Sequence, residues 1–190
     1  VDLTADTDTD RIVDWSYRLL PVRADLAPED PGTLQVVKEW EAKAGELVDR
    51  PLGRAAQRLN KMDLVSLAQV AFLESTGADY AHQNSGGTRG SIPAGEFTYR
   101  AVWNVFPFEN TLVVATVPGH QIPRNFYGKQ AIDPAKTYKI VTNSFVRDQW
   151  KKNFPSSPHF VWEDTGLSLR DAILRYIEKR KTVERVTLTR

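Results

Sequence analysis

Residues 76–89 read Thr-Gly-Ala-Asp-Tyr-Ala-His-Gln-Asn-Ser-Gly-Gly-Thr-Arg, and they join a strand pattern to a glycine-rich loop. Residues 78–84 alternate as a strand does, and four glycines follow within residues 85–95. Consecutive glycines let the backbone approach a ligand closely, because no Cβ obstructs it. Successive free N–H groups there can form an anion-binding nest, and Arg89 adds a planar cation suited to phosphate or carboxylate. The stretch favours an anionic ligand, although a glycine turn with a surface arginine is the simpler interpretation of the same spacing.

Helix and strand patterns are interspersed on both sides of this loop, which indicates a mixed α/β or α+β class. The amphipathic helices are expected to begin at capping residues and to end at Gly or Pro. The expected elements are a strand at 11–24, a helix capped by Thr33, a second amphipathic helix from Asp63 to Gly77, a short helix at 98–105, strands at 110–117 and 138–142, a short helix or loop at 145–154, a helix capped by Ser168, and a strand at 182–189.

Two aromatic segments could stack on a ligand. In Phe106-Pro107-Phe108 the proline fixes the direction of a neighbouring ring, and a rigid ring of this kind suits a base. We expect Phe106 in the core, and the residues leave Phe108 open between core and site. In residues 147–154 aromatics alternate with basic residues, which suits a ligand, but Trp150 and Phe154 are also spaced to pack four apart on an amphipathic turn.

The composition excludes several function classes. The chain has 190 residues, of which 41% are hydrophobic and 26% charged, as in an ordinary globular domain. Lys and Arg number 25 against 24 Asp and Glu, which argues against a nucleic-acid polymer as partner. There is no Cys, and the three histidines (His82, His120 and His159) have no metal-ligand spacing. No nucleophile elbow, P-loop or dinucleotide fingerprint occurs, and no apolar run approaches the roughly 20 residues of a membrane span. A self-contained active site is therefore not visible.

Several motifs, taken in order, resemble the C-terminal domain of the 5'-nucleotidase family. The matching stretches are Thr76–Asn84, Gly86–Arg89, Ile92–Glu96, Thr98-Tyr99, Pro107–Asn110, Thr111–Val114, Asp133–Ile140 and Thr142–Phe145. The opening Ile12–Val22 is similar to the segment that leaves the family's N-terminal domain. The chain starts at Val1 without an initiator Met, so we expect a processed product or a piece of a longer protein.

The resemblance implies a four-layer α/β/β/α sandwich that recognises a nucleotide or nucleoside. Residues 1–24 would be the end of the linker from an N-terminal metallophosphoesterase domain, and residues 25–190 the nucleotide-binding domain. The absent domain would hold two divalent metal ions, and this chain would hold no cofactor. The family also implies a hydrolase, a 5'-nucleotidase, as the parent protein, in the periplasm or outside the cell. The alternative is a structural module that packs on the metallophosphoesterase domain without binding a base.

The resemblance also implies site residues. Arg89 matches the arginine on the phosphate side of the substrate, Asn84 the asparagine that begins the loop containing Gly86 and Gly87, and Phe108 one of two rings that sandwich the base. The family's Gly-Gly-Asp-Gly-aromatic motif, which supplies the other ring, is missing after Phe145. By spacing, Phe154 or Trp150 is expected to supply that ring. The stretch from Gly119 to Asp133 is shorter than in the family, and Asp63–Ser66 lacks the family's second cationic contact.

Overall fold

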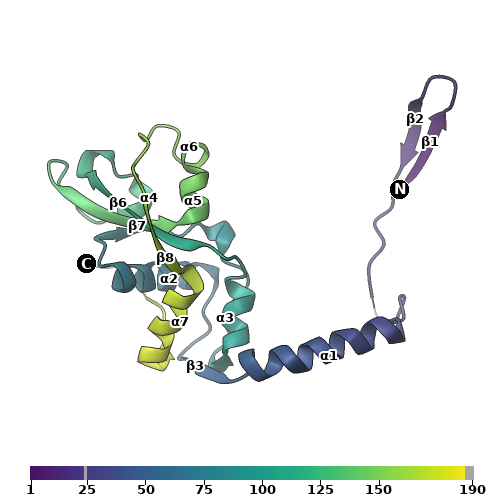
Figure 1. The fold of residues 1–190 in the computed structure, drawn as a ribbon, viewed down its shortest axis with the longest axis horizontal. Helices are drawn as coiled ribbons and strands as arrows, with labels where there is room; N and C mark the ends of the chain where they lie inside the picture. The colour runs from purple at the N-terminus through teal and green to yellow at the C-terminus, as the bar shows by residue number, and fades with distance from the viewer. Residues whose placement is uncertain (24, 187–190) are drawn as a thin grey trace. The chain divides into compact units, whose positions relative to one another are not determined.

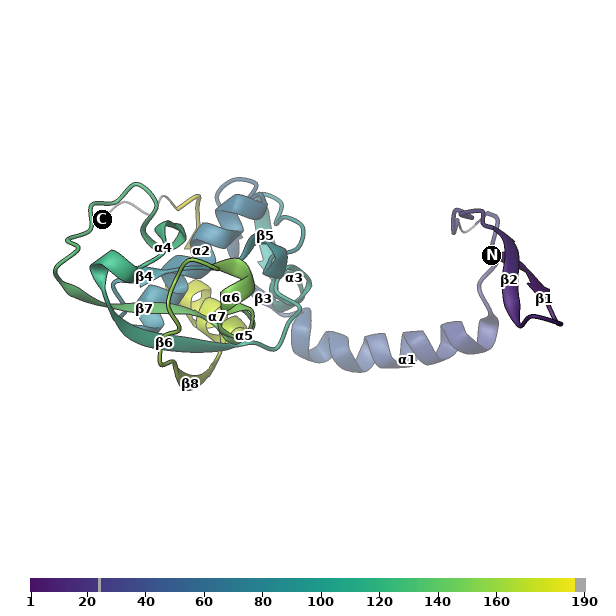
Figure 2. The ribbon, with the colours of Figure 1, turned by 90° about the horizontal axis from the view of Figure 1, so that it is seen from above.

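The chain divides into two units, Val1–Ala44 and Gly45–Arg190, and the first of them begins with a β-hairpin (Figures 1 and 2). The computed structural model describes residues 1–23 and 25–186. β1 (Asp2–Asp6) pairs antiparallel with β2 (Arg11–Ser16). The strand expected at 11–24 therefore ends at Ser16, and residue 24 lies outside the described residues.

Helix α1 (Pro31–Val48) starts earlier than its expected cap. Asp30 accepts the main-chain N–H of Thr33 at 2.8 Å, so Asp30 rather than Thr33 caps the helix. Pro31 suits the first helical position because its φ is already helical and its missing N–H would have no partner there.

The second unit contains a four-stranded sheet in the order β4-β7-β6-β8. In that order the strands are Tyr80–Ala81, Thr137–Asn143, Thr111–Pro118 and Glu163–Ser168. Leu112 and Val114 on β6 belong to one hydrophobic cluster, whereas Ala115 and Val117 belong to another on the opposite face. Both faces are covered, which explains the nearly continuous apolar run that predicted this strand.

A smaller sheet has the order β5-β3-β9. Its strands are Gly95–Thr98, Pro51–Ala55 and Thr182–Val183. The strand expected at 182–189 is thus short: residues 184–186 lie outside it, and residues 187–189 lie outside the described part of the chain.

Helices α2 (Lys61–Thr76) and α7 (Leu169–Arg180) lie between the two sheets (Figure 1). α2 contacts β4 and β7 of the larger sheet, α7 contacts β3 of the smaller sheet and β8 of the larger one, and the two helices contact each other. The buried residues of α2 are Asp63, Leu64, Val65, Leu67, Ala68, Gln69, Ala71 and Phe72. They cover more than one face, so α2 is a core helix rather than the amphipathic helix that we expected.

The mixed α/β class is confirmed, with sheets and helices in layers. Within that class the order of layers differs from the expected α/β/β/α sandwich, because α2 and α7 separate the sheets. Short helices cover the outer face of the larger sheet: α4 (Arg124–Tyr127), α5 (Ser144–Asp148) and α6 (Trp150–Asn153).

Two expected helix ends are confirmed. Gly77 ends α2 with φ 63°, in the left-handed region, and its N–H bonds to Leu73 O. The Ser168 side chain accepts the Asp171 N–H at the start of α7. α3 (Tyr99–Val105) follows Thr98 as expected, but the Thr98 side chain makes no capping hydrogen bond.

His82 is partly buried among aromatic rings. Its ring centroid lies 5.3 Å from that of Phe126 and 5.6 Å from that of Phe154. Burial lowers the pKa of His82 below its ordinary 6.5, because the charged imidazolium loses hydration. His120 and His159 are exposed, so the three histidines do not gather.

We expect His82 to make the fold less stable in mild acid. The unfolded chain takes up a proton at His82 near pH 6.5, before the folded chain does, so stability falls as the pH drops below that value. Urea unfolding at pH 7.5 and 5.5 should show a larger loss for wild type than for His82→Gln. Carboxyls whose pKa is lowered, such as those of Glu74 and Asp164, take up protons at lower pH, so they do not cause the difference in stability between pH 7.5 and 5.5. Equal losses in the two proteins would contradict the assignment.

Candidate functional site

Three segments meet at one edge of the larger sheet. The glycine loop η1 (Ser85–Gly87) follows β4, and α5 follows β7. β4 runs parallel to β7, so their carboxyl ends lie together. β6 runs antiparallel to β7 with Leu112 opposite Asn143, which brings the α3–β6 connection to the same edge. The topology therefore assembles a site from parts that are distant in the sequence.

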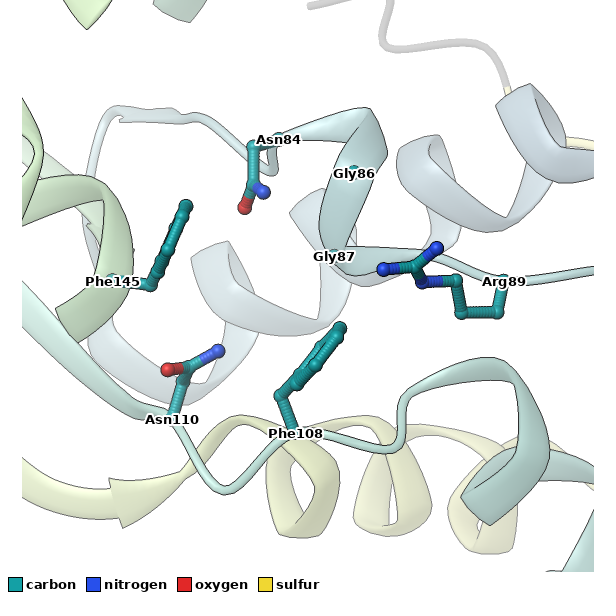
Figure 3. A pocket seen from close by; sticks show the side chains of 7 residues that line it. All are labelled: Asn84, Gly86, Gly87, Arg89, Phe108, Asn110 and Phe145. Carbon is teal, nitrogen blue, oxygen red and sulfur yellow. The ribbon is translucent and has the colours of Figure 1, made fainter. Parts of the chain in front are cut away.

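A pocket of about 340 Å³ lies among these three segments (Figure 3). It is lined by Asn84, Gly86, Gly87, Arg89, Phe108, Asn110 and Phe145. Five of the seven residues expected at the site thus come together here, and Asn110 and Phe145 join them.

Two exposed aromatic rings line this pocket. Phe108 is 42% exposed and comes from the α3–β6 connection, whereas Phe145 is 48% exposed and comes from the first turn of α5. The neighbouring Phe106 is 1% exposed, so it is a core residue as expected. Exposed rings on separate elements leave apolar faces available to a planar ligand.

Arg170 fixes the backbone that carries Phe108. Its guanidinium donates to Phe106 O at 3.0 Å and to Phe108 O at 3.5 Å, and it lies 3.5 Å from the centroid of the Trp103 ring. Burial lowers the pKa of Arg170 from its ordinary value, with the negative charges of Glu109 and Asp171 opposing the shift. The buried Arg170 therefore fixes the main chain at Phe106 and Phe108 through these hydrogen bonds.

The side chain of Arg89 lies beside Phe108 at the pocket (Figure 3). Its guanidinium carbon lies 5.4 Å from the Phe108 ring centroid, and its main-chain N–H donates to Val105 O at 2.7 Å. No carboxylate of the described residues forms an ion pair with it. Arg89 thus has its backbone fixed and its charge available at the rim of the pocket.

Three N–H groups of the loop in which we expect an anion-binding nest are hydrogen-bonded within the protein. The Gly87 N–H donates to Asn84 O at 3.0 Å, the Thr88 N–H to Ser85 O at 3.2 Å, and the Arg89 N–H to Val105 O. These three N–H groups donate to the protein's own carbonyls, and the side chain of Arg89 brings a positive charge to the pocket.

The role of Gly87 is close packing. A Cβ at position 87 would lie 2.8 Å from Gln83 Nε2, 3.1 Å from Asn84 Oδ1 and 3.3 Å from Asn84 Nδ2. Gln83 is 2% exposed, so its amide has little room to move. The glycine allows two amide side chains to fold against the loop.

Trp150 and Phe154 do not reach the pocket. They are 2% and 8% exposed, and their ring centroids lie 4.5 Å apart in the outer hydrophobic cluster. Trp150 also donates its indole N–H to Pro158 O at 2.8 Å. The packing of residues four apart explains this segment, as the amphipathic alternative predicted, and it removes both residues from the candidate site.

Phe145 occupies the place across from Phe108 that Phe154 or Trp150 was expected to take. The sequence held one signal for it: Phe145 is the second residue after Asn143, which caps α5 through the Val146 N–H. Phe145 and Val146 share this first turn, and it is Val146 that is buried.

The described residues contain no group of three or more His, Cys, Asp or Glu side chains that could hold a metal ion. No helix among them has the length and apolar character needed to cross a bilayer.

Residues 40–127 match the family model described as the C-terminal domain of 5'-nucleotidase. This stretch of the chain is similar to the family's C-terminal domain. Protein UshA of Yersinia enterocolitica is 27% identical over 231 residues, which covers 89% of this chain and 41% of that protein. A 5'-nucleotidase of Vibrio vulnificus is 32% identical over 103 residues, covering 50% of this chain and 19% of the relative. This chain thus spans less than half the length of these relatives.

Solved structures share the fold of this chain. The 5'-nucleotidase precursor of Thermus thermophilus matches with a TM-score of 0.70 at 20% identity, over 97% of this chain and 47% of that one. The sulfate thiohydrolase SoxB of the same genus matches with a TM-score of 0.60 at 13% identity, over 93% and 41%. SoxB is named for a reaction other than nucleotide hydrolysis. The fold alone therefore does not specify a ligand, and an argument about the ligand has to start from the residues of the pocket.

Proposed function

We propose that residues 45–186 bind the base of a nucleotide between Phe108 and Phe145, with Arg89 on the phosphate side. The observation that carries the proposal is the pair of half-exposed rings facing one pocket beside an arginine that has no carboxylate partner among the described residues. Stacking suits any base, because every base has a π face.

The charge of Arg89 supports a phosphate ester rather than a neutral ligand. A guanidinium presents a planar fork of donors that matches phosphate oxygens, and it stays charged at any physiological pH. Its contact with the Phe108 ring at 5.4 Å ties the position of the cation to that of the stacking face. One ligand could therefore engage both features.

We propose further that this domain is the substrate-recognition part of a 5'-nucleotidase that acts in the periplasm or outside the cell. Its partner would be a metallophosphoesterase domain of the same protein, in keeping with the relatives, of which this chain covers less than half. Two divalent metal ions held by that domain would supply an activated water for hydrolysis of the phosphate ester. The residues described here would bind and orient the substrate.

Calorimetric titration of the 190-residue chain with AMP and with adenosine tests the proposal. We expect saturable heat with both ligands, and weak binding, since no second domain closes over the pocket. Arg89→Ala should raise the Kd for AMP on the order of tenfold and change the Kd for adenosine much less, because only AMP loses a charge-assisted contact.

Arg58→Ala is the matched control. Arg58 is an exposed arginine that donates to Ser91 Oγ at 2.9 Å and does not line the pocket. Its replacement should leave both Kd values unchanged. Absence of heat with folded wild-type protein would support the alternative of a structural module. An equal loss for AMP and adenosine in Arg89→Ala would contradict the assigned phosphate side.

A further inference from the structure

Asn143 is a fully buried amide whose orientation is fixed by the backbone. It is the last residue of β7, and its Oδ1 accepts the Val146 N–H at 3.0 Å. A backbone N–H can only donate, so the atom facing it must be the oxygen. The Nδ2 of Asn143 is therefore a donor, and it donates to Gln83 Oε1 at 2.9 Å and to Asn84 Oδ1 at 3.0 Å.

Asn143 in turn orients the side chain of Asn84, which lines the pocket. The Oδ1 of Asn84 accepts the hydrogen bond from Asn143. The Nδ2 of Asn84 has no hydrogen-bond partner among the described residues. Gln83, whose oxygen is also taken, donates its Nε2 to Thr88 Oγ1 at 3.4 Å. This chain of buried amides links α5 to the glycine loop and leaves Asn84 offering a donor.

Asn110 lies on the other wall of the pocket, and its oxygen faces a serine hydroxyl, a group that can donate or accept. The hydroxyl of Ser144 accepts the Thr111 N–H at 3.2 Å and donates to Asn110 Oδ1 at 3.5 Å. The nitrogen of Asn110 then points toward Phe108 (Figure 3). Arg89 has no acceptor atom at all. The polar side chains that line the pocket thus present donors.

We propose that Asn143 is a positioning residue that fixes this donor polarity, so that the pocket selects bases by the acceptor atoms on their edge. The inference rests on the proposed function and adds specificity to it. A ring that lacks the matching acceptor leaves a pocket donor unpaired, and sites that hydrogen-bond their substrate discriminate strongly against such analogues.

The test uses adenosine and the three analogues in which N1, N3 or N7 is replaced by C–H. None of the four carries a phosphate, so the phosphate contact of Arg89 does not enter. Calorimetry on wild type should show at least one analogue binding about 3- to 10-fold more weakly than adenosine, the value of one hydrogen bond.

Asn143→Asp should abolish or reverse that difference. The new carboxylate still accepts the Val146 N–H but has no donor, so Asn84 must turn its Nδ2 inward and expose its Oδ1 to the pocket. If Asn143 had only a structural role, its substitution would instead weaken the binding of adenosine and of all three analogues by the same factor. Near-ultraviolet circular dichroism verifies that the variant is folded.

Asn84→Asp provides a second route if the buried substitution does not fold. It keeps an oxygen for Asn143 to donate to and replaces the pocket-facing nitrogen by an acceptor. It too should erase the preference for the ring nitrogen. The inference is overturned if wild type binds adenosine and all three analogues within twofold, or if the preference persists in the folded variants. Absence of adenosine binding by wild type overturns the proposed function, and this inference with it.

Discussion

Phe145→Ala is expected to raise the Kd for adenosine about 5- to 150-fold, which corresponds to the roughly 1–3 kcal/mol of one base–aromatic contact. Phe108→Ala should fall in the same range. Both side chains are about half exposed, so their removal leaves little cavity and the fold should persist. Calorimetry with adenosine measures the effect without the contribution of a phosphate.

Phe145→Tyr and Phe145→Leu are matched controls. Tyrosine keeps the aromatic face, so its Kd should stay within about twofold of wild type, whereas leucine keeps apolar area but loses the π face and should behave more like alanine. If Phe145→Ala binds adenosine as wild type does, Phe145 has no part in the site and the sandwich with Phe108 is wrong.

Of the two glycines that line the pocket, Gly87 should tolerate replacement by alanine less well, with losses in both stability and adenosine binding. The new Cβ would meet Gln83 Nε2 at 2.8 Å and both Asn84 amide atoms within 3.3 Å. Gln83 cannot retreat without breaking its bonds to Asn143 and Thr88. We expect a loss of about 1–3 kcal/mol in the free energy of unfolding, as for overpacked sites, and at least tenfold weaker adenosine binding.

Gly86→Ala controls for adding a methyl group to the same loop. Its Cβ would meet only Asn84 Nδ2, at 3.6 Å, which is an ordinary contact distance. Urea unfolding and calorimetry should therefore place this variant close to wild type. Equal behaviour of the two alanine variants would show that close packing of the amides on Gly87 is unimportant.

Local sequence patterns predicted many elements of the second unit. The apolar run that forms β6 and the glycine that ends α2 each depend on neighbours within a few residues, which a sequence displays directly. The position of α2 between the sheets was missed, because its burial on several sides is contributed by α7, β4 and β7. The cap of α1 was misplaced at Thr33 because Asp30 and Thr33 are both suitable capping residues.

The site could be predicted where it is continuous in sequence. Asn84, Gly86, Gly87 and Arg89 share one loop, whereas the residues around Pro107 left Phe108 open between core and site and only the family resemblance placed it at the site. The second ring depends on which aromatics the core absorbs. Trp150 and Phe154 pack together at 4.5 Å, and Phe145 is the ring left outside. The hydrogen bond from Asn143 to Asn84 joins residues 59 apart, so no local pattern could reveal it.

The sandwich of a base between Phe108 and Phe145 is tested most directly by nuclear Overhauser spectroscopy of adenosine bound to the full chain, with phenylalanine rings selectively protonated. We expect intermolecular contacts from the base protons to the rings of both Phe108 and Phe145, each lost in the corresponding alanine variant. Contacts from bound adenosine to Phe154 or other rings, with none to Phe108 and Phe145, would contradict the proposed site.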